Sequence, residues 1–204
     1  MLSIAPTPLV AILRGVKPDE AEAIASVIIE AGFGAVEVPL NSPDPFVSIE
    51  TLARMFGDRI MVGAGTVLKA SEVDQAAAAG ARLVVAPNAD PAVIERAVEA
   101  GLATLPGVAT PTEAFRALGL GASGIKLFPA EAMPPEIVRA WRPVLPKKTQ
   151  LFPVGGITPE RIAPYRKAGA DGFGIGGALY RPGATPAEVA ARARAFVAAW
   201  REGG

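Results

Sequence analysis

The chain has 204 residues, half of them apolar, and its 20 basic residues balance 20 acidic ones. This length and apolar content suit one substantial hydrophobic core, so we expect a single domain over residues 1–204. The balanced charge argues against nucleic-acid or anionic-membrane partners, and no apolar run approaches the length of about 18 residues that a membrane-spanning helix needs.

Short apolar runs alternate along the chain with alanine-rich segments of helical pattern. Eight strands are predicted, at Leu9–Leu13, Ala35–Leu40, Ile60–Gly65, Leu83–Ala86, Ala103–Leu105, Gly124–Phe128, Leu151–Val154 and Gly172–Ile175. Eight helices are predicted, at Asp19–Ala31, Asp44–Phe56, Ser71–Ala79, Pro91–Ala100, Pro111–Leu118, Pro135–Trp141, Pro159–Ala168 and Pro186–Trp200. Asp or Pro near the first turn and glycine after the last turn mark the ends of several of these helices.

Eight strand–helix units in 204 residues leave about 25 residues for each unit, which favours a compact α/β fold of the (β/α)8 TIM-barrel type. An open doubly wound sheet is the alternative. That fold usually carries Gly-x-Gly-x-x-Gly after its first strand, whereas Leu13-Arg14-Gly15 follows the first strand here. No linker or low-complexity stretch divides the chain, so a single barrel is the predicted architecture.

Lys126 stands within the otherwise apolar segment Gly124–Phe128. Burial of an ammonium group is unfavourable, so it lowers the pKa of the group and favours the neutral amine. A neutral amine in a dry pocket is a nucleophile suited to attack on a ketone, with formation of a Schiff base. The alternative is a lysine whose aliphatic stem packs in the core while its ammonium reaches the rim.

The chain contains no cysteine and no histidine. These absences exclude thiol nucleophiles, disulfides, Ser-His-Asp systems and histidine ligands for zinc. A carboxylate site for a hard cation is still conceivable, but no EF-hand or clustered Asp/Glu spacing supports one. The N-terminal sequence also lacks the basic region and long apolar core of a signal peptide, so we expect a cytoplasmic protein.

Glu37 interrupts the apolar run Ala35–Leu40 much as Lys126 interrupts its own strand. The second and sixth predicted strands are both even-numbered, and alternate strands of a barrel contribute inward side chains to the same layers. Glu37 and Lys126 are therefore expected to face each other and to serve one substrate carbon. A buried pair that merely satisfies itself is less favoured, because such pairs rarely offset their desolvation.

Further candidates lie at the carboxyl ends of the predicted strands, where the chemistry of a barrel gathers. Arg14 is placed either to clamp a carboxylate through two parallel hydrogen bonds or to form a salt bridge at the rim. Thr66 either contacts a substrate or caps the next helix. Five residues end or follow the seventh and eighth strands, the usual phosphate position, where backbone N–H groups can bind an anion: Val154, Gly155, Gly156, Gly176 and Gly177.

Several segments occur in order at these strand ends: Val10–Gly15, Ala31–Pro43, Gly63–Leu68, Leu105–Gly107, Ile125–Pro129 and Val154–Ile157. Together they resemble the short class I aldolases that act on 2-keto-3-deoxy-6-phospho-sugar acids. The resemblance implies Lys126 as the Schiff-base lysine, Glu37 as the proton-transfer residue, Arg14 and Thr66 near the pyruvyl end, and the glycine loops near the phosphate. It also implies that no metal or organic cofactor is needed, and a homotrimer is common in the family.

Asn41 indicates which branch of this family the chain is similar to. Gluconate-type members typically carry a Thr-Leu-Arg-Thr run after the glutamate, which places an arginine where this chain has Asn41. The run Pro39–Pro43 is instead similar to the galactonate branch. The resemblance thus implies cleavage of 2-dehydro-3-deoxy-6-phosphogalactonate to pyruvate and D-glyceraldehyde 3-phosphate in galactonate catabolism. Gly177 departs from relatives that often carry serine, so one hydroxyl contact to the phosphate is expected to be missing.

The sequence leaves three alternatives open. A gluconate-type or dual-specificity aldolase would differ in its activity on the two C4 epimers. A phosphate-binding barrel isomerase or synthase would use Lys126 only electrostatically, and a non-catalytic sugar-phosphate sensor would have no use for the Lys–Glu pair. The expected partners are a small phosphorylated sugar acid and pyruvate, with no nucleic acid or membrane.

Overall fold

The computed structural model describes residues 4–203. Within them, the strands are β1 Leu9–Ile12, β2 Ala35–Pro39, β3 Met61–Gly65, β4 Leu83–Val85, β5 Ala103–Leu105, β6 Gly107–Val108, β7 Ile125–Leu127, β8 Leu151–Pro153 and β9 Phe173–Ile175. The helices are α1 Pro18–Ala31, α2 Pro45–Phe56, α3 Ala70–Ala78, α4 Pro91–Glu99, α5 Pro111–Gly119, α6 Pro135–Trp141, α7 Pro159–Ala168 and α8 Pro186–Glu202. This is an α/β fold in which strands and helices alternate.

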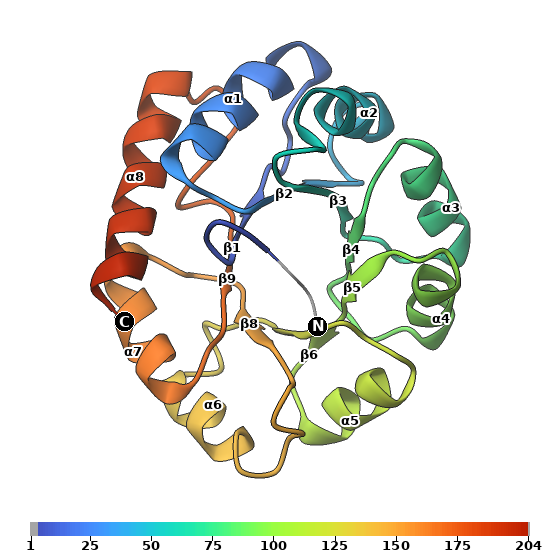
Figure 1. Cartoon of the computed structure of the whole chain (residues 1–204), viewed down its shortest axis with the longest axis vertical. Coiled ribbons are helices and arrows are strands. Elements are labelled where there is room, and N and C mark those ends of the chain that lie inside the picture. Colours follow the sequence, from blue (N-terminus) through green and yellow to red (C-terminus); the bar gives the residue numbers. More distant parts are fainter. Residues whose placement is uncertain (1–3, 204) are drawn as a thin grey trace.

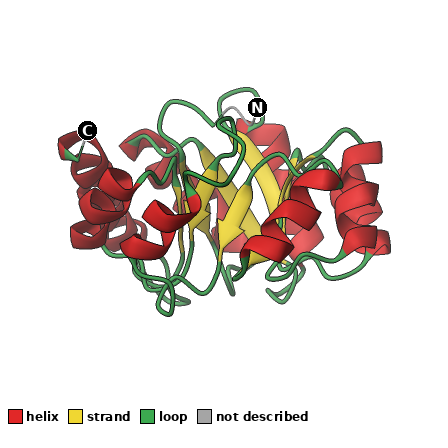
Figure 2. Ribbon diagram, turned by 90° about the horizontal axis from the view of Figure 1, so that it is seen from below, coloured by secondary structure: helices red, strands yellow, loops and turns green. Residues whose placement is uncertain are grey.

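The strands form a parallel sheet that curls around a central axis, with the helices on its outside (Figure 1, Figure 2). Six strands pair in the order β5-β4-β3-β2-β1-β9, and three pair in the order β6-β7-β8. A parallel bridge between Val154, directly after β8, and Gly174 of β9 joins the two groups. The carboxyl ends of all these strands therefore lie at one end of the molecule, as a parallel arrangement requires.

The predicted strands and helices agree with the structure to within one or two residues at each end. The prediction missed β6, which begins directly after Pro106. Proline has no N–H group to donate, so ladder pairing breaks there and resumes at Gly107, whose partner in the register is Lys126. The fifth predicted strand is thus two short strands, and Lys126 lies on β7, the strand of the sixth strand–helix unit.

Two apolar clusters hold the fold. The larger one fills the layer between sheet and helices, where alternate strand residues such as Leu9 and Ala11 meet helix residues such as Ile24 and Ile28. The smaller one lies inside the curl and consists of Val10, Ala35, Leu83, Val85, Leu105 and Phe152. The interior of the curl is therefore largely packed with side chains, and a charged group placed there is surrounded by apolar atoms.

Capping boxes begin two of the outer helices. Thr110 accepts from the backbone N–H of Glu113 at the start of α5, and Thr185 accepts from that of Glu188 at the start of α8, while both glutamates accept from the capping residue's own N–H. Among residues 4–203, no helix is both long enough and apolar enough to cross a membrane.

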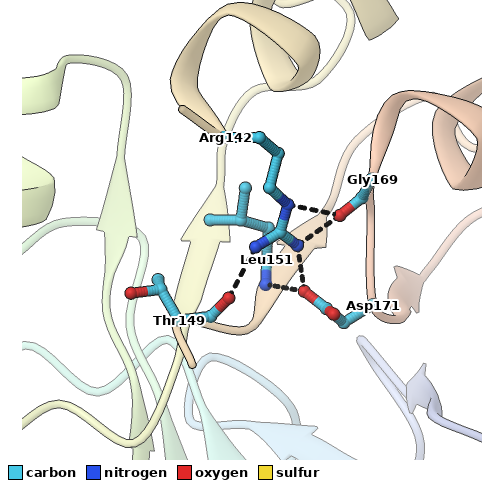
Figure 3. A network of polar contacts seen from close by, with 5 residues as sticks. All are labelled: Arg142, Thr149, Leu151, Gly169 and Asp171. Carbon is cyan, nitrogen blue, oxygen red and sulfur yellow. Dashed lines mark hydrogen bonds and ion pairs between the residues drawn. The ribbon is translucent and has the colours of Figure 1, made fainter. Parts of the chain in front are cut away.

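Arg142, after α6, ties together the segments that lead into β8 and β9 (Figure 3). Its guanidinium donates to the backbone oxygens of Thr149 and Gly169, each at 2.7 Å, and forms an ion pair with Asp171. The Asp171 carboxylate also accepts from the backbone N–H of Leu151 at 2.8 Å. This network lies at the amino ends of β8 and β9, opposite to the candidate catalytic residues, so we interpret it as structural.

Candidate active site

Glu37 on β2 and Lys126 on β7 are the two buried charged residues of the described chain, 2% and 6% exposed. Both line one small cavity inside the curl, whose other walls are apolar apart from the Gly174 backbone. The cavity volume is about 10 Å³, which is about the lower limit for one water molecule. The expectation that these two side chains reach the same interior space therefore agrees with the structure.

Burial and mutual attraction act in opposite directions on this pair. Burial raises the pKa of Glu37 from 4.5 to about 7, although the charges of Lys126 and Arg14 lower it. Burial lowers the pKa of Lys126, and Arg14 lowers it further, while Glu37 raises it. Near neutral pH, the pair therefore supplies a carboxyl group poised to gain or lose a proton and an amine that is more readily neutral than an exposed lysine.

Phe128 is a further neighbour of the lysine, and the sequence reasoning did not single it out. Its ring centroid lies 4.5 Å from the Lys126 Nζ, a distance at which an aromatic face attracts an ammonium. Residues 126 and 128 are two positions apart at the end of β7, which is the spacing that places side chains on one face of a strand. That spacing was the available signal.

Arg14 extends from the end of β1 and bonds to two neutral oxygens. Its Nη1 donates to the Asn41 Oδ1 at 2.6 Å, and its Nη2 donates to the Thr66 Oγ1 at 3.4 Å. Arg14 forms no ion pair with any residue that the structure describes, so its charge is available to an anionic ligand. The predicted alternative of a rim salt bridge is not seen in residues 4–203.

Thr66 does not cap the next helix, since the residue before α3 in the capping position is Lys69. Its backbone has a φ of 56°, in the left-handed region that a β-branched residue rarely adopts. Such a conformation costs about 1–3 kcal/mol and is concentrated at functional sites. The threonine is thus held in an unfavourable conformation with its hydroxyl next to Arg14.

A larger cavity of about 600 Å³ adjoins the first. It is lined by all five residues predicted for the anion site, Val154, Gly155, Gly156, Gly176 and Gly177. Gly155 and Gly156 have φ angles of 109° and 58°, which glycine adopts without strain. Arg14 and Arg181 also line this cavity, and Arg181 was missed from the sequence because nothing in its turn-like context distinguishes it from a solvated arginine.

The two cavities share three lining residues, Ile12, Val154 and Gly174. A methyl group on Gly174 would come within 2.7 Å of the Val154 Cγ2 and would narrow this junction. A ligand with an anionic group in the larger cavity can therefore extend towards Lys126. Among residues 4–203, there is no group of three or more Asp or Glu side chains arranged to hold a metal ion.

Comparison with known proteins gives a consistent result. The family model "Aldolase: KDPG and KHG aldolase" matches residues 3–188. The chain is 49% identical to a probable 2-dehydro-3-deoxy-6-phosphogalactonate aldolase of Rhizobium meliloti, over 95% of this chain and 91% of the relative. It is also 49% identical to the 2-dehydro-3-deoxy-6-phosphogalactonate aldolase of Escherichia coli, over 96% and 95%. A solved structure described as native KDPGal superposes with a TM-score of 0.97 at 47% identity, over 100% of this chain and 98% of that one.

Proposed function

Because the chain belongs to the KDPG and KHG aldolase family, we propose that it is a class I aldolase that cleaves 2-dehydro-3-deoxy-6-phosphogalactonate to pyruvate and D-glyceraldehyde 3-phosphate in galactonate catabolism. The observation that carries the proposal is the buried pair of Lys126 and Glu37, in a cavity that adjoins a glycine-lined one. The names of the relatives at 49% identity support the same substrate.

In the proposed reaction, the neutral amine of Lys126 attacks the C2 ketone of the substrate, and loss of water gives an iminium ion that acts as an electron sink. Glu37, through one water molecule, accepts the proton of the C4 hydroxyl while the C3–C4 bond breaks. The bonding electrons form an enamine, and glyceraldehyde 3-phosphate leaves. The enamine then takes a proton at C3, and hydrolysis of the resulting iminium releases pyruvate and restores the amine.

The acid–base properties of Glu37 suit both halves of this cycle. A group that must first accept a proton and later return one works best when its pKa is close to the working pH, and the pKa of Glu37 is raised to about 7. The cavity of about 10 Å³ beside it supports a single intervening water. No step of this cycle needs a metal ion or an organic cofactor.

The remaining site residues divide between the two ends of the substrate. Arg14 binds the carboxylate at the pyruvyl end, because its guanidinium lacks a carboxylate partner within the described chain and is available for a bidentate contact. Thr66 lies beside it and accepts a hydrogen bond from its Nη2. Val154, Gly155, Gly156, Gly176 and Gly177 surround the phosphate, which backbone N–H groups and Arg181 attract. At Gly177 an added methyl group would approach only the Arg181 Nε, at 3.9 Å, so a serine would fit and its absence removes one phosphate contact.

We infer that the curled sheet is a closed (β/α)8 barrel of a single domain, which is supported by the Val154–Gly174 bridge and by β6 following β5 directly. A homotrimer in the cytoplasm is the state that the family resemblance suggests. Analytical ultracentrifugation tests the trimer.

The decisive test of the substrate compares the two C4 epimers. Asn41 accepts a hydrogen bond from Arg14 and is not among the residues that line either described cavity of the site. A neutral amide thus lies beside Arg14 where gluconate-type members carry a second cation, and this difference, together with the names of the relatives, leads us to expect a preference for the galacto epimer. A misplaced hydroxyl contact costs about 1–3 kcal/mol, so a preference of about tenfold in kcat/KM is expected. A clear preference for the gluco epimer would reassign the substrate and leave the Schiff-base mechanism intact.

A further inference from the structure

Gly65, the last residue of β3, lies against the carboxyl group of Glu37 on the neighbouring strand β2. A β-carbon built on Gly65 would come within 2.5 Å of the Glu37 Oε1, and it would be closer still to the carboxyl carbon and to Oε2. Real β-carbons do not approach other atoms so closely. The carboxyl group therefore occupies the space that any side chain at position 65 would need.

The backbone gives no other reason for glycine at this position. The φ angle of Gly65 is not in the left-handed region, so its conformation is open to ordinary residues. The three atoms nearest to the added β-carbon all belong to Glu37. Gly63 on the same strand differs, because a β-carbon there would meet the backbone oxygen of Leu83 at 2.6 Å. Gly63 is required by strand packing, whereas Gly65 is required by one side chain.

Hydrogen bonds do not fix the Glu37 carboxyl group. Its Oε2 is buried and has no hydrogen-bond partner among residues 4–203. Most buried side-chain polar atoms have at least one hydrogen-bond partner, so another feature must set the position of this oxygen. The carboxyl group lies against the bare backbone of Gly65 on one side, and the small cavity that it shares with Lys126 lies on the other. Contact with Gly65 therefore limits where the carboxyl group can lie.

We propose that Gly65 is a positioning residue, whose missing side chain creates the seat of the Glu37 carboxyl group and so keeps it one water molecule away from the reacting carbon. This inference rests on the proposed function, in which Glu37 transfers protons. An added methyl group would push the carboxyl group into the cavity of about 10 Å³, where it would displace the water and approach Lys126.

The test uses Gly65→Ala in two backgrounds. In the wild-type background, displacement of the carboxyl group should lower cleavage about 10²-fold, the scale of a misplaced catalytic group, while borohydride trapping of pyruvate on Lys126 persists. In a Glu37→Asp background, the acid is one methylene shorter, so its carboxyl group is withdrawn from the new methyl group and the overlap is smaller. Gly65→Ala should then cost much less activity, and the double variant should be more active than Gly65→Ala alone. Additive losses, or near-normal cleavage by Gly65→Ala, would overturn the inference.

A stability measurement keeps the inference testable if Gly65→Ala folds poorly. In a Glu37→Ala background the seat is empty, so Gly65→Ala should leave the denaturation midpoint unchanged, whereas Gly63→Ala should lower it in both backgrounds. Equal destabilisation by Gly65→Ala with and without the Glu37 side chain would show that the Glu37 carboxyl group is not what excludes a side chain at position 65. Normal turnover in Glu37→Asp and Glu37→Ala would instead refute the catalytic role of Glu37, a separate result.

Discussion

Replacement of Glu37 by glutamine separates the contribution of this residue to catalysis from the effect of its burial on the stability of the fold. Glutamine has nearly the same shape as glutamate but cannot accept a proton at neutral pH. Cleavage should fall by roughly 10²–10⁴-fold, the usual range for loss of a general acid–base. Trapping of pyruvate on Lys126 should partly survive, because formation of the iminium depends first on the amine.

The same substitution should increase the free energy of unfolding, and the size of this gain can be estimated from the pKa shift that burial causes. The pKa of Glu37 rises from 4.5 to about 7 on folding, which corresponds to about 3 kcal/mol. Because the folded state binds this proton more tightly, the group's contribution to the free energy of unfolding is complete below pH 4.5 and is lost as the pH rises towards about 7. Glu37→Gln removes that loss, so the variant should be more stable than the wild type above pH 7 by up to about 3 kcal/mol.

The same change also acts on the lysine. Glu37 raises the pKa of Lys126, against the effect of burial. Without the carboxylate, the pKa of Lys126 should fall further, so trapping of pyruvate should persist to lower pH than in the wild type. The variant thus separates the roles of the two residues. Position 37 no longer transfers a proton, whereas a larger fraction of Lys126 is neutral at a given pH.

Urea denaturation at about pH 5 and about pH 8 measures the stability effect, and a coupled assay of pyruvate release measures turnover. Glu22→Gln is the matched control, since Glu22 is exposed on α1 and should alter neither quantity. A stability gain that is equal at both pH values would refute the reasoning from burial. Turnover close to the wild-type value would show that Glu37 is only structural.

Three further predictions concern the rest of the site. Sodium borohydride with pyruvate should add a three-carbon label to Lys126 and abolish activity, and an unchanged intact mass or a label on another lysine would contradict the assignment. Gly156→Val and Gly176→Val should raise KM for the phosphorylated substrate, on the order of tenfold or more, with little effect on pyruvate trapping. Gly101→Val is the control for Gly156→Val, because its φ of 72° carries similar backbone strain outside the cavity, whereas Gly176 is not in the left-handed region and needs no such control; equal damage in all three would point to misfolding. Arg14→Lys should raise KM about tenfold through loss of a bidentate contact, and an unchanged KM would place the substrate carboxylate elsewhere.

The sequence predicted the features that depend on local pattern. Strand and helix positions follow from apolar runs, prolines and glycines, and the element bounds agree with the structure closely. Lys126 and Glu37 were identifiable because each interrupts an apolar strand, and charged residues in such a setting are expensive to bury. Their expected meeting depended on a barrel geometry in which even-numbered strands share layers.

Features that depend on contact between distant segments could not be predicted in this way. In the sequence, Gly65 is one more small residue at the end of a strand, and only the position of the Glu37 carboxyl group explains why glycine is needed there. The left-handed conformation of Thr66 is equally invisible, since no propensity favours it. The hydrogen bond from Arg14 to the Asn41 amide oxygen also joins positions 27 residues apart in the chain.

The Arg142 network suggests how mutational tolerance is distributed over this protein. It fastens the amino ends of β8 and β9 through backbone oxygens and Asp171, while the glycine-lined cavity lies beyond their carboxyl ends. One end of the same two strands therefore anchors the fold, and the other end holds the ligand. Libraries that randomise the loops around the cavity should therefore retain folded members when Arg142 and Asp171 are kept. Variants with altered substrate specificity are best sought at the carboxyl ends of the strands.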